Sequence, residues 1–417
     1  MRMTSDTAIA LHHPKHAHWL HAETEQRIND FFDRFFVDGK DHILHGKLPS
    51  VNSVQLISND YLCLSGEHSL VDAQLEQLRL YKKNAVVSGV FIRDDSPTRR
   101  LEKQIATFLK AESGIICQSG WSANISLMQT IASPKIPVYL DMKAHASLWE
   151  GANAAGSKSI PFYHNDLAHL ERSIQSNGPG ILVVESVYST DGSVCPLDDI
   201  VYLAEKYECI IVVDESHSIG THGPHGAGFV VKHKLQDRVH FRTFSLAKTY
   251  AGRGGFITCS ERFKAYFFCE ARPAIFSSHL LDHEFAWYSE ATKFIQAADD
   301  RRATLKSNFI YLRAKLLELG YPVSEGSEQI IGLEAGPEHK TRILRDALQD
   351  NEIFGSVFLA PATPKNRSLV RLSVNSSITK DQLDMTVEAC KKIRDHIGLK
   401  NWASVRRKKT VLQRAAE

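Results

Sequence analysis

Between about residues 110 and 260 the sequence alternates short apolar runs with amphipathic helical patterns. The runs have the length of strands and are GIICQS, IPVYLD, GILVVES, CIIVVDE, VHFRTFS and GGFITCS. Between two of them, PLDDIVYLAEKYE shows apolar residues at helical spacing, with Asp198 or Asp199 available as the N-cap. Strands that alternate with helices favour a mainly parallel sheet covered by helices on both faces. The chain is therefore predicted to be an α/β protein.

The character of the sequence changes after about residue 290. A charged segment with a helical pattern ends at Gly320, and glycine suits the C′ position that follows a helix. The short runs SEQIIGLEA and SLVRLSV come after it and are predicted to be strands. Thr379 and Gln382 form a T-x-x-Q capping box that opens a final helix. We expect four parts: an N-terminal segment whose helix packs against the others (1–57), a large domain (58–290), a small α+β domain (291–400) and a basic tail (401–417).

Composition and charge narrow the classes of function. A formal charge of +2 over 417 residues gives no overall field that favours nucleic acid. No stretch approaches the ~20 apolar residues of a membrane span, and the N-terminus lacks the apolar core of a secretory signal. The seven cysteines lie far apart without a C-x-x-C motif, which indicates a reducing compartment. We expect a cytoplasmic protein that binds no nucleic acid and does not insert stably into membranes.

Two terminal features are interpreted as solvated ends of the chain. The N-terminal histidines have no acid or cysteine at ligand spacing, so no metal site is expected among His12, His13, His16, His18 and His21. The basic cluster at 406–409 is interpreted as a solvated tail.

The stretch CIIVVDESHSIGTHG places acidic residues and a histidine at the end of an apolar run. A charged residue there lies where open α/β sheets bind ligands, beyond the carboxyl ends of the strands. A magnesium nucleotide would need the loop G-x-x-x-x-G-K-[ST], and a zinc site H-E-x-x-H or C-x-x-C; the sequence contains none of these. A serine hydrolase would need G-x-S-x-G, and the nearest match, at 120–124, fails at its last position. An organic cofactor remains.

One lysine, in TFSLAKTYAGRGGFITC, suits such a cofactor. Lys248 follows a short strand and precedes a glycine-rich turn, where small residues let a flat ligand approach the backbone. A lysine so placed is the usual means of holding pyridoxal phosphate as a Schiff base. That cofactor also needs a carboxylate for its ring nitrogen, donors for its phosphate and a flat group against its ring.

Residues after other strands meet these needs. Asp214 can form a charge-assisted bond with the pyridinium nitrogen. His217 can reach the ring hydroxyl or the substrate carbonyl, and His145 can stack on the ring. Free N–H groups at a helix N-terminus, together with a nearby hydroxyl, can bind the phosphate. The residues expected to do so are Ser119, Gly120, Trp121 and Ser245.

These residues carry a resemblance to a known family. The chain resembles the α-oxoamine synthases, which are pyridoxal-phosphate enzymes of fold type I. The matching motifs span roughly residues 55 to 390 in the family's order and are SNDYLCL, SGWSAN, AHASLWEG, VESVYSTDG, VDESHSIGTHGPHGAG, SLAKT and VRLSVN. The resemblance implies a large domain with a mainly parallel sheet, a smaller α+β C-terminal domain, and a homodimer with shared active sites.

The resemblance also implies a role for each residue already singled out. Lys248 would be the Schiff-base lysine and Asp214 the pyridinium partner. His145 would be the stacking residue and His217 the donor to the cofactor hydroxyl. Electron-sink chemistry would then make Lys248 the general base for the α-proton of the amino acid.

Five further positions acquire a meaning only through the resemblance. Glu185 and Ser189 match positions near the substrate and the cofactor. Asn59 and Arg371 match the pair that holds the amino-acid carboxylate, a task to which a guanidinium is well suited. Ser278 matches a position that usually reaches the phosphate of the neighbouring subunit.

Within the family, further segments are similar to one subgroup. SGWSANISLMQTI, AHASLWEGA, SLAKTYA, PAIFSS, SEQIIGLE and FGSVFLAPAT are similar to the bacterial α-hydroxyketone quorum-sensing autoinducer synthases. Biosynthetic members carry a glycine-rich stretch with an arginine and a histidine before a Leu-Glu helix start. Here SGVFIRDDSPTRRLEKQ has one glycine and no histidine, although Ser96 and Pro97 still make a good helix start. This loop is a candidate for contact with acyl-CoA.

The expected reaction condenses an amino acid, 2-aminobutyrate-like or S-adenosylmethionine, with a medium- or long-chain acyl-CoA. Coenzyme A and carbon dioxide leave, and the product is an α-aminoketone precursor of an α-hydroxyketone autoinducer. Three alternatives stay open: a biosynthetic synthase of the 8-amino-7-oxononanoate synthase or 2-amino-3-ketobutyrate CoA ligase type, a fold type I decarboxylase or aminotransferase, and a binding sensor without catalysis.

Overall fold

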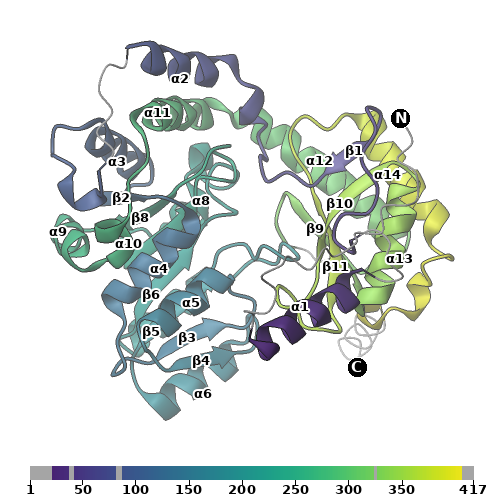
Figure 1. Cartoon of the computed structure of the whole chain (residues 1–417), viewed down its shortest axis with the longest axis horizontal. Helices are drawn as coiled ribbons and strands as arrows, with labels where there is room; N and C mark the ends of the chain where they lie inside the picture. Colours follow the sequence, from purple (N-terminus) through teal and green to yellow (C-terminus); the bar gives the residue numbers. More distant parts are fainter. Residues whose placement is uncertain (1–20, 37–41, 81–86, 324–325, 406–417) are drawn as a thin grey trace.

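The computed structural model describes residues 21–36, 42–80, 87–323 and 326–405, and two β-sheets organise them (Figure 1). The larger sheet has the strand order β2-β8-β7-β6-β5-β3-β4. Its strands are β2 (Ser113–Cys117), β3 (Val138–Asp141), β4 (Ser159–Phe162), β5 (Ile181–Glu185), β6 (Ile210–Asp214), β7 (Phe241–Ser245) and β8 (Gly255–Cys259). β8 runs antiparallel to β2 and β7, and the pairs from β7 to β4 are parallel.

The predicted α/β class is confirmed, because all six predicted runs are strands of this sheet. β4 was not predicted: it is a four-residue edge strand, SIPF, in which only Phe162 is fully buried. Successive residues of the central strands enter different cores. In β6, Ile211 and Val213 belong to one buried cluster and Val212 to the other. The sheet therefore has an apolar core on each face.

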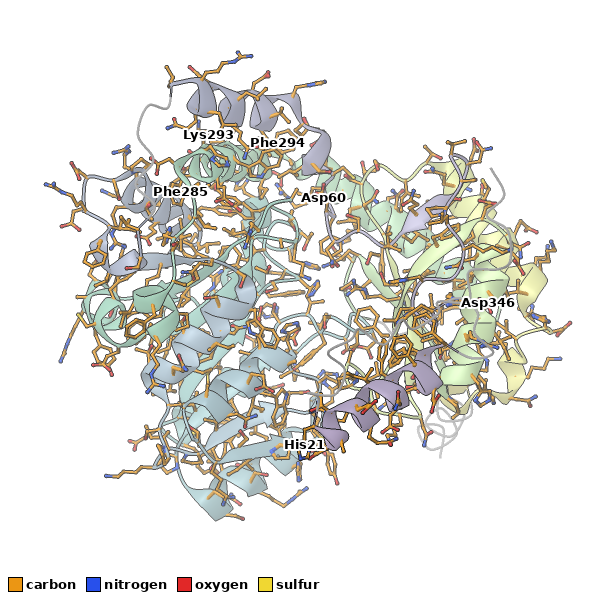
Figure 2. The ribbon with its side chains drawn as sticks, in the orientation of Figure 1. His21, Asp60, Phe285, Lys293, Phe294 and Asp346 are labelled. Carbon is orange, nitrogen blue, oxygen red and sulfur yellow. The ribbon has the colours of Figure 1, made fainter. Side chains whose placement is uncertain are left out.

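Helices cover both faces of this sheet, and α2 lies outside them against α11 (Figure 1). The helices of this part of the chain are α2 (His68–Leu80), α3 (Pro97–Phe108), α4 (Gly120–Ile131), α5 (Ala146–Ala154), α6 (Leu167–Asn177), α7 (Leu197–Lys206), α8 (Gly228–Lys232), α9 (Glu261–Glu270), α10 (Arg272–Phe276) and α11 (Asp282–Ala297). α11 buries Phe285 and turns Lys293 outward, as the side chains in Figure 2 show.

Of two predicted N-caps, the structure confirms the one at α3 and contradicts the one at α7. Ser96 caps α3 by accepting the N–H of Arg99, with Pro97 at N1, as expected. The predicted helix α7 is confirmed, but its predicted cap is wrong. Its N-cap is Pro196, and Asp198 and Asp199 lie in the first turn, where their charges still favour the helix dipole.

The smaller sheet combines one strand from the N-terminal segment with three strands from the C-terminal part of the chain. Its order is β1-β10-β11-β9, with strands β1 (Val54–Leu56), β9 (Ile330–Gly336), β10 (Ile353–Phe358) and β11 (Ser368–Ser373). Helices α12 (Asp299–Glu318), α13 (Glu338–Gln349) and α14 (Lys380–Ile393) accompany it. β1 pairs in parallel with β10, so the N-terminal segment contributes a strand that the sequence did not predict.

The predicted features of the small domain are confirmed at its helix ends. Gly320 follows the C-cap of α12 with a φ of +88°, and the Thr379–Gln382 capping box opens α14. The predicted N-terminal helix is α1 (Ala22–Phe35), in which no residue is fully buried; Arg34 ties it to Glu338 of α13. The proposed domain boundaries stay predictions.

Three further predictions concern the termini, the cysteines and the membrane. The basic cluster and the N-terminal histidines other than His21 lie outside the described residues, so both interpretations stay predictions. All seven cysteines are free. No helix in the described ranges is both long and apolar enough to span a membrane.

Candidate active site

The predicted site residues lie around the carboxyl ends of the central strands of the large sheet. The register pairs Glu185 of β5 with Asp214 of β6, and Asp214 with Thr243 of β7, so β5 and β6 end at the same level and β7 continues for two further residues. Loops that follow strands of this sheet carry His145, Ser189, His217 and Lys248. This edge is where open α/β sheets bind ligands.

Asp214 is a buried carboxylate without a direct ion pair. Its side chain is 4% exposed, and its oxygens accept hydrogen bonds from Asn124 Nδ2 at 2.8 Å and from the N–H of Ser216 at 2.9 Å. Within the part of the chain that the structure describes, no lysine, arginine or histidine forms an ion pair with it. Because an unpaired buried charge is costly, this carboxylate fits a cationic group such as a protonated pyridine nitrogen.

Lys248 is the half-buried amine of the site. Its Nζ makes no hydrogen bond or ion pair with any residue in the described ranges, so the amine is uncommitted. Burial lowers the pKa of Lys248, the positive charge of Arg371 lowers it further, and Asp214 and Glu185 act in the opposite direction. The amine is therefore neutral, and able to act as a nucleophile or base, at a lower pH than an ordinary lysine.

Glu185 is a second buried acid beside Asp214. Burial, and then the charge of Asp214, raise the pKa of Glu185 well above its usual value. The backbone N–H groups of His145 and Ser189 act in the opposite direction and lower this pKa, and Oε1 has no hydrogen-bond partner among the described residues.

His145 is held in place by a chain of hydrogen bonds that leads to Asp214. It caps α5, and its Nδ1 lies 2.8 Å from Ser147 Oγ. Asn124 donates both to that hydroxyl, at 2.9 Å, and to Asp214. The exposed ring of Trp121 lies edge-on to His145, with 6.0 Å between ring centroids. The predicted stacking residue and the predicted pyridinium partner therefore share one support.

The predicted phosphate donors form a close junction between α4 and the loop after β7. Ser119 caps α4 by accepting the N–H of Ser122 at 2.9 Å. A Cβ added to Gly120 would lie 2.6 Å from Cβ of Ser245, so only glycine lets the helix start approach that loop so closely. The amides at the helix start and the Ser245 hydroxyl lie next to one another, an arrangement that suits a phosphate.

Arg371 brings together residues that are far apart in the sequence. Its Nη2 donates to Asn59 Oδ1 at 2.9 Å and its Nη1 to the carbonyl of Ser189 at 2.8 Å. The guanidinium lies over the ring of Phe358, 4.6 Å from its centroid, and Nε has no hydrogen-bond partner among the described residues. This nearly buried guanidinium has a free donor for a carboxylate.

Ser278 is an exposed residue near the start of α4. Its carbonyl accepts a hydrogen bond from Gln118, the residue before Ser119, at 3.2 Å. In the described parts of the chain, no contact joins its hydroxyl to the other predicted site residues. Its role toward a neighbouring subunit stays a prediction.

Two supporting residues were not predicted, although both lie inside the motifs. Asn124, which holds Asp214, is the residue at which SGWSAN departs from G-x-S-x-G. Tyr61, in SNDYLCL, lies 2.7 Å from Nδ1 of His217 through its hydroxyl. Their partners lie 90 and 156 residues away, so spacing in the sequence does not reveal them.

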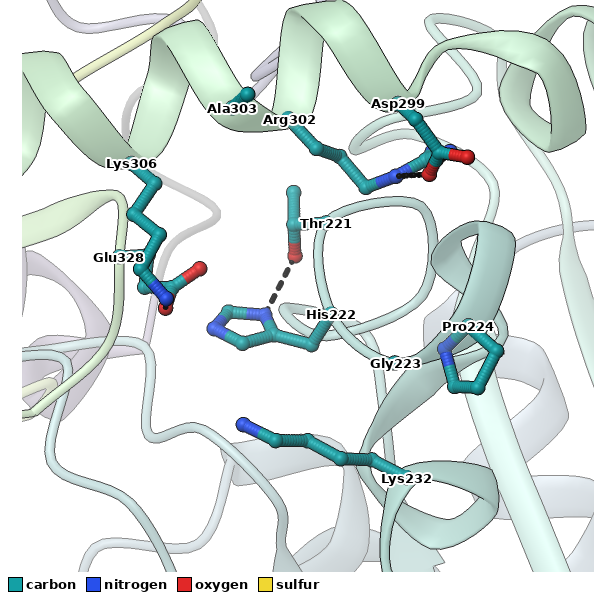
Figure 3. Close-up of a pocket in the computed structure, with 10 residues that line it drawn as sticks. All are labelled: Thr221, His222, Gly223, Pro224, Lys232, Asp299, Arg302, Ala303, Lys306 and Glu328. Atoms are coloured by element: carbon teal, nitrogen blue, oxygen red, sulfur yellow. Dashed lines mark hydrogen bonds and ion pairs between the residues drawn. The ribbon is translucent and has the colours of Figure 1, made fainter.

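A separate hollow of about 390 Å³ is lined by residues 221–224 and by residues of α12 (Figure 3). His222 and Thr221 face it, but it contains none of the predicted site residues. Its cations are largely compensated, since Lys306 pairs with Glu328 at 2.8 Å and Arg302 with Asp299. The hollow is therefore not the site of the chemistry.

Comparisons with known proteins agree with this geometry. The family model for aminotransferase class I and II matches residues 51–390. A CAI-1 autoinducer synthase of Vibrio campbellii is 42% identical over 359 residues, 86% of this chain and 91% of that protein. An 8-amino-7-oxononanoate synthase of Lysinibacillus sphaericus is 32% identical over 345 residues, 82% and 89% of the two chains.

A solved structure with the same fold is serine palmitoyltransferase from S. paucimobilis with PLP and myriocin bound. It superposes with a TM-score of 0.81 at 21% identity, over 90% of this chain and 98% of that one. The predicted pyridoxal-phosphate fold type I is thereby confirmed. The chain belongs to the aminotransferase class I and II family, and within it to the α-oxoamine synthases.

Proposed function

We propose that the chain is a pyridoxal-phosphate-dependent acyltransferase that condenses an amino acid with an acyl-CoA and releases coenzyme A and carbon dioxide. The observation that carries the proposal is that two groups lie at one edge of the large sheet. One is the amine of Lys248, and the other is the buried carboxylate of Asp214; neither forms an ion pair with a described residue. The cofactor needs both groups, one to attach it and one to keep its ring nitrogen protonated.

The residues around that pair each do one task in this proposal. When bound, pyridoxal phosphate supplies an electron sink for the electron pair left at the α-carbon of the amino acid. Asp214 would hold a proton on the ring nitrogen, and His145 would lie against the ring. The start of α4 and Ser245 would hold the phosphate. Lys248 would take the α-proton, a role that its lowered pKa supports.

Arg371 and Asn59 orient the amino acid by its carboxylate, for which the guanidinium keeps a free N–H. The α-carbon then attacks the thioester carbonyl; a C–C bond forms, the C–S bond breaks, and coenzyme A leaves as its thiolate. The carboxylate is lost as carbon dioxide, and the α-carbon takes a proton. His217 is the group proposed to donate a hydrogen bond to an oxygen of the cofactor or of the substrate.

The substrate class proposed is a medium- or long-chain acyl-CoA with a 2-aminobutyrate-like amino acid or S-adenosylmethionine. The product would be an α-aminoketone precursor of an α-hydroxyketone autoinducer. This choice is supported by the 42% identity to an autoinducer synthase, against 32% to an 8-amino-7-oxononanoate synthase. The alternative is a biosynthetic α-oxoamine synthase. A homodimer is part of the proposal, with the exposed Ser278 facing the neighbouring cofactor phosphate.

A series of acyl-CoA substrates tests the proposed chain length. Burying one methylene is worth about 0.8 kcal/mol, so kcat/KM should rise about 4-fold with each added methylene for as long as the protein buries it. The rate is measured as coenzyme A release with a thiol reagent, from acetyl-CoA to long saturated chains, with pimeloyl-CoA as the dicarboxylate comparison. A preference for acetyl- or pimeloyl-CoA would replace the proposal by the biosynthetic alternative. Release of no coenzyme A with any of them would contradict both.

A further inference from the structure

Tyr61 lies between two parts of the candidate site. Its side chain is fully buried, and its hydroxyl lies 2.7 Å from His217 Nδ1 and 3.2 Å from Asn59 Oδ1. Asn59 Oδ1 already accepts a hydrogen bond from Arg371 at 2.9 Å. One buried phenol therefore connects the imidazole to the pair proposed to bind the substrate carboxylate.

The charge states of these groups restrict where the protons lie. Burial raises the pKa of Tyr61, so the phenol keeps its proton. Burial, followed by the positive charges of Lys248 and Arg371, lowers the pKa of His217 well below its usual value. His217 is thus a neutral imidazole with a single N–H, and the phenol has a single O–H.

The geometry favours one of two proton arrangements. In one arrangement the phenol donates a hydrogen bond to Nδ1, and the histidine proton is then on Nε2. In the other, the phenol donates to Asn59 Oδ1 and accepts a hydrogen bond from Nδ1–H. The contact with Nδ1 is short, whereas 3.2 Å is long for an O–H···O bond, and Asn59 Oδ1 is already engaged with a guanidinium. The donation from Tyr61 to Nδ1 is therefore the better arrangement.

The second ring nitrogen of His217, Nε2, is available to a ligand, because no residue in the described ranges forms a hydrogen bond with it. The backbone of His217 is held in addition by Gln329, whose amide donates to its carbonyl. The ring is thus supported by one side-chain hydrogen bond, at Nδ1.

We propose that Tyr61 is a positioning residue that keeps His217 in the Nε2–H form, so that this N–H donates to an oxygen of the cofactor or substrate. The role in turnover rests on the proposed function, whereas the assignment of the tautomer does not.

The tautomer can be measured in the cofactor-free protein. Long-range ¹H–¹⁵N correlation spectra of ¹⁵N-histidine-labelled protein distinguish Nδ1–H from Nε2–H, and a His217→Asn variant assigns the signal among the 20 histidines. The wild-type protein should show the Nε2–H form at His217, and Tyr61→Phe should show a mixture or the Nδ1–H form. An Nδ1–H signal in the wild-type protein would overturn the proposal, even if Tyr61→Phe fails to fold.

Kinetics of the holoenzyme then distinguish a positioning role of Tyr61 from a purely structural role of its hydroxyl. Tyr61→Phe is expected to lower kcat by about 10- to 100-fold, with little change in KM for the acyl-CoA, and to change the visible spectrum of the bound cofactor. The matched control is Tyr321→Phe, a buried phenol that donates to the carbonyl of Cys390 at 2.8 Å in the small domain; it should leave kcat and the spectrum unchanged. An unchanged tautomer in a folded Tyr61→Phe protein would refute the positioning role and leave the proposed function intact.

Discussion

Lys248→Ala is expected to remove turnover and the visible absorbance of covalently held cofactor. The variant loses both the attachment point and the base, and proton transfer by a placed side chain is alone worth roughly 10²–10⁴-fold in rate. Stability should change little, because Lys248 Nζ makes no hydrogen bond or ion pair with any residue in the described ranges and its charged form is disfavoured by burial. The measurements are coenzyme A release, absorbance and thermal unfolding.

Two control variants make the loss specific. Lys248→Arg keeps the charge but cannot form a Schiff base, so it should be as inactive as the alanine variant. Lys293→Ala removes an exposed lysine of α11 and should behave like the wild-type protein. Near-normal turnover and colour in Lys248→Ala would show that a different lysine holds the cofactor.

Asp214→Asn is expected to weaken cofactor binding by about 10- to 100-fold, since a hydrogen bond to a charged group contributes about 1.5–3 kcal/mol. The amide has the shape of the carboxylate but cannot hold a proton on the ring nitrogen. Exchange of the amino-acid α-hydrogen with deuterium from solvent should therefore fall by at least about 100-fold, because the electron sink is lost. Asp214→Ala should show the same two defects.

A control variant in the exchange experiment shows whether the loss is specific to the charge of Asp214. Asp198→Asn alters an exposed carboxylate of α7 that pairs with His233, and it should exchange at the wild-type rate. If Asp214→Asn also exchanged the α-hydrogen at the wild-type rate, Asp214 would have no part in stabilising the carbanion.

The central strands and their end residues could be predicted because their signals are local. Runs such as GILVVES and CIIVVDE are mostly continuous and apolar, and the parallel register brings the ends of β5 and β6, with Glu185 and Asp214, to one level. The edge strands β4 and β1 could not be predicted, because segments of four and three residues are too short to give a clear pattern. β1 also depends on β10, about 300 residues away in the chain.

The supports of the site could not be predicted for a different reason. Asn124 and Tyr61 act through partners chosen by the fold, and neither residue type indicates its partner. The cap of α7 is a second case in which residue type alone does not predict the structure. Asp198 and Asp199 are better capping residues than proline, yet the N-cap is Pro196, two positions before Asp198.

Condensation with loss of the carboxyl group is the central claim, and one isotope experiment tests it directly. The purified holoenzyme is given a medium-chain acyl-CoA and an amino acid labelled with ¹³C in its carboxyl group. Coenzyme A, labelled carbon dioxide and the α-aminoketone are then quantified in the same reaction. The account predicts equal amounts of all three, with no label in the ketone. Coenzyme A released without labelled carbon dioxide, or labelled carbon dioxide without coenzyme A, would contradict it.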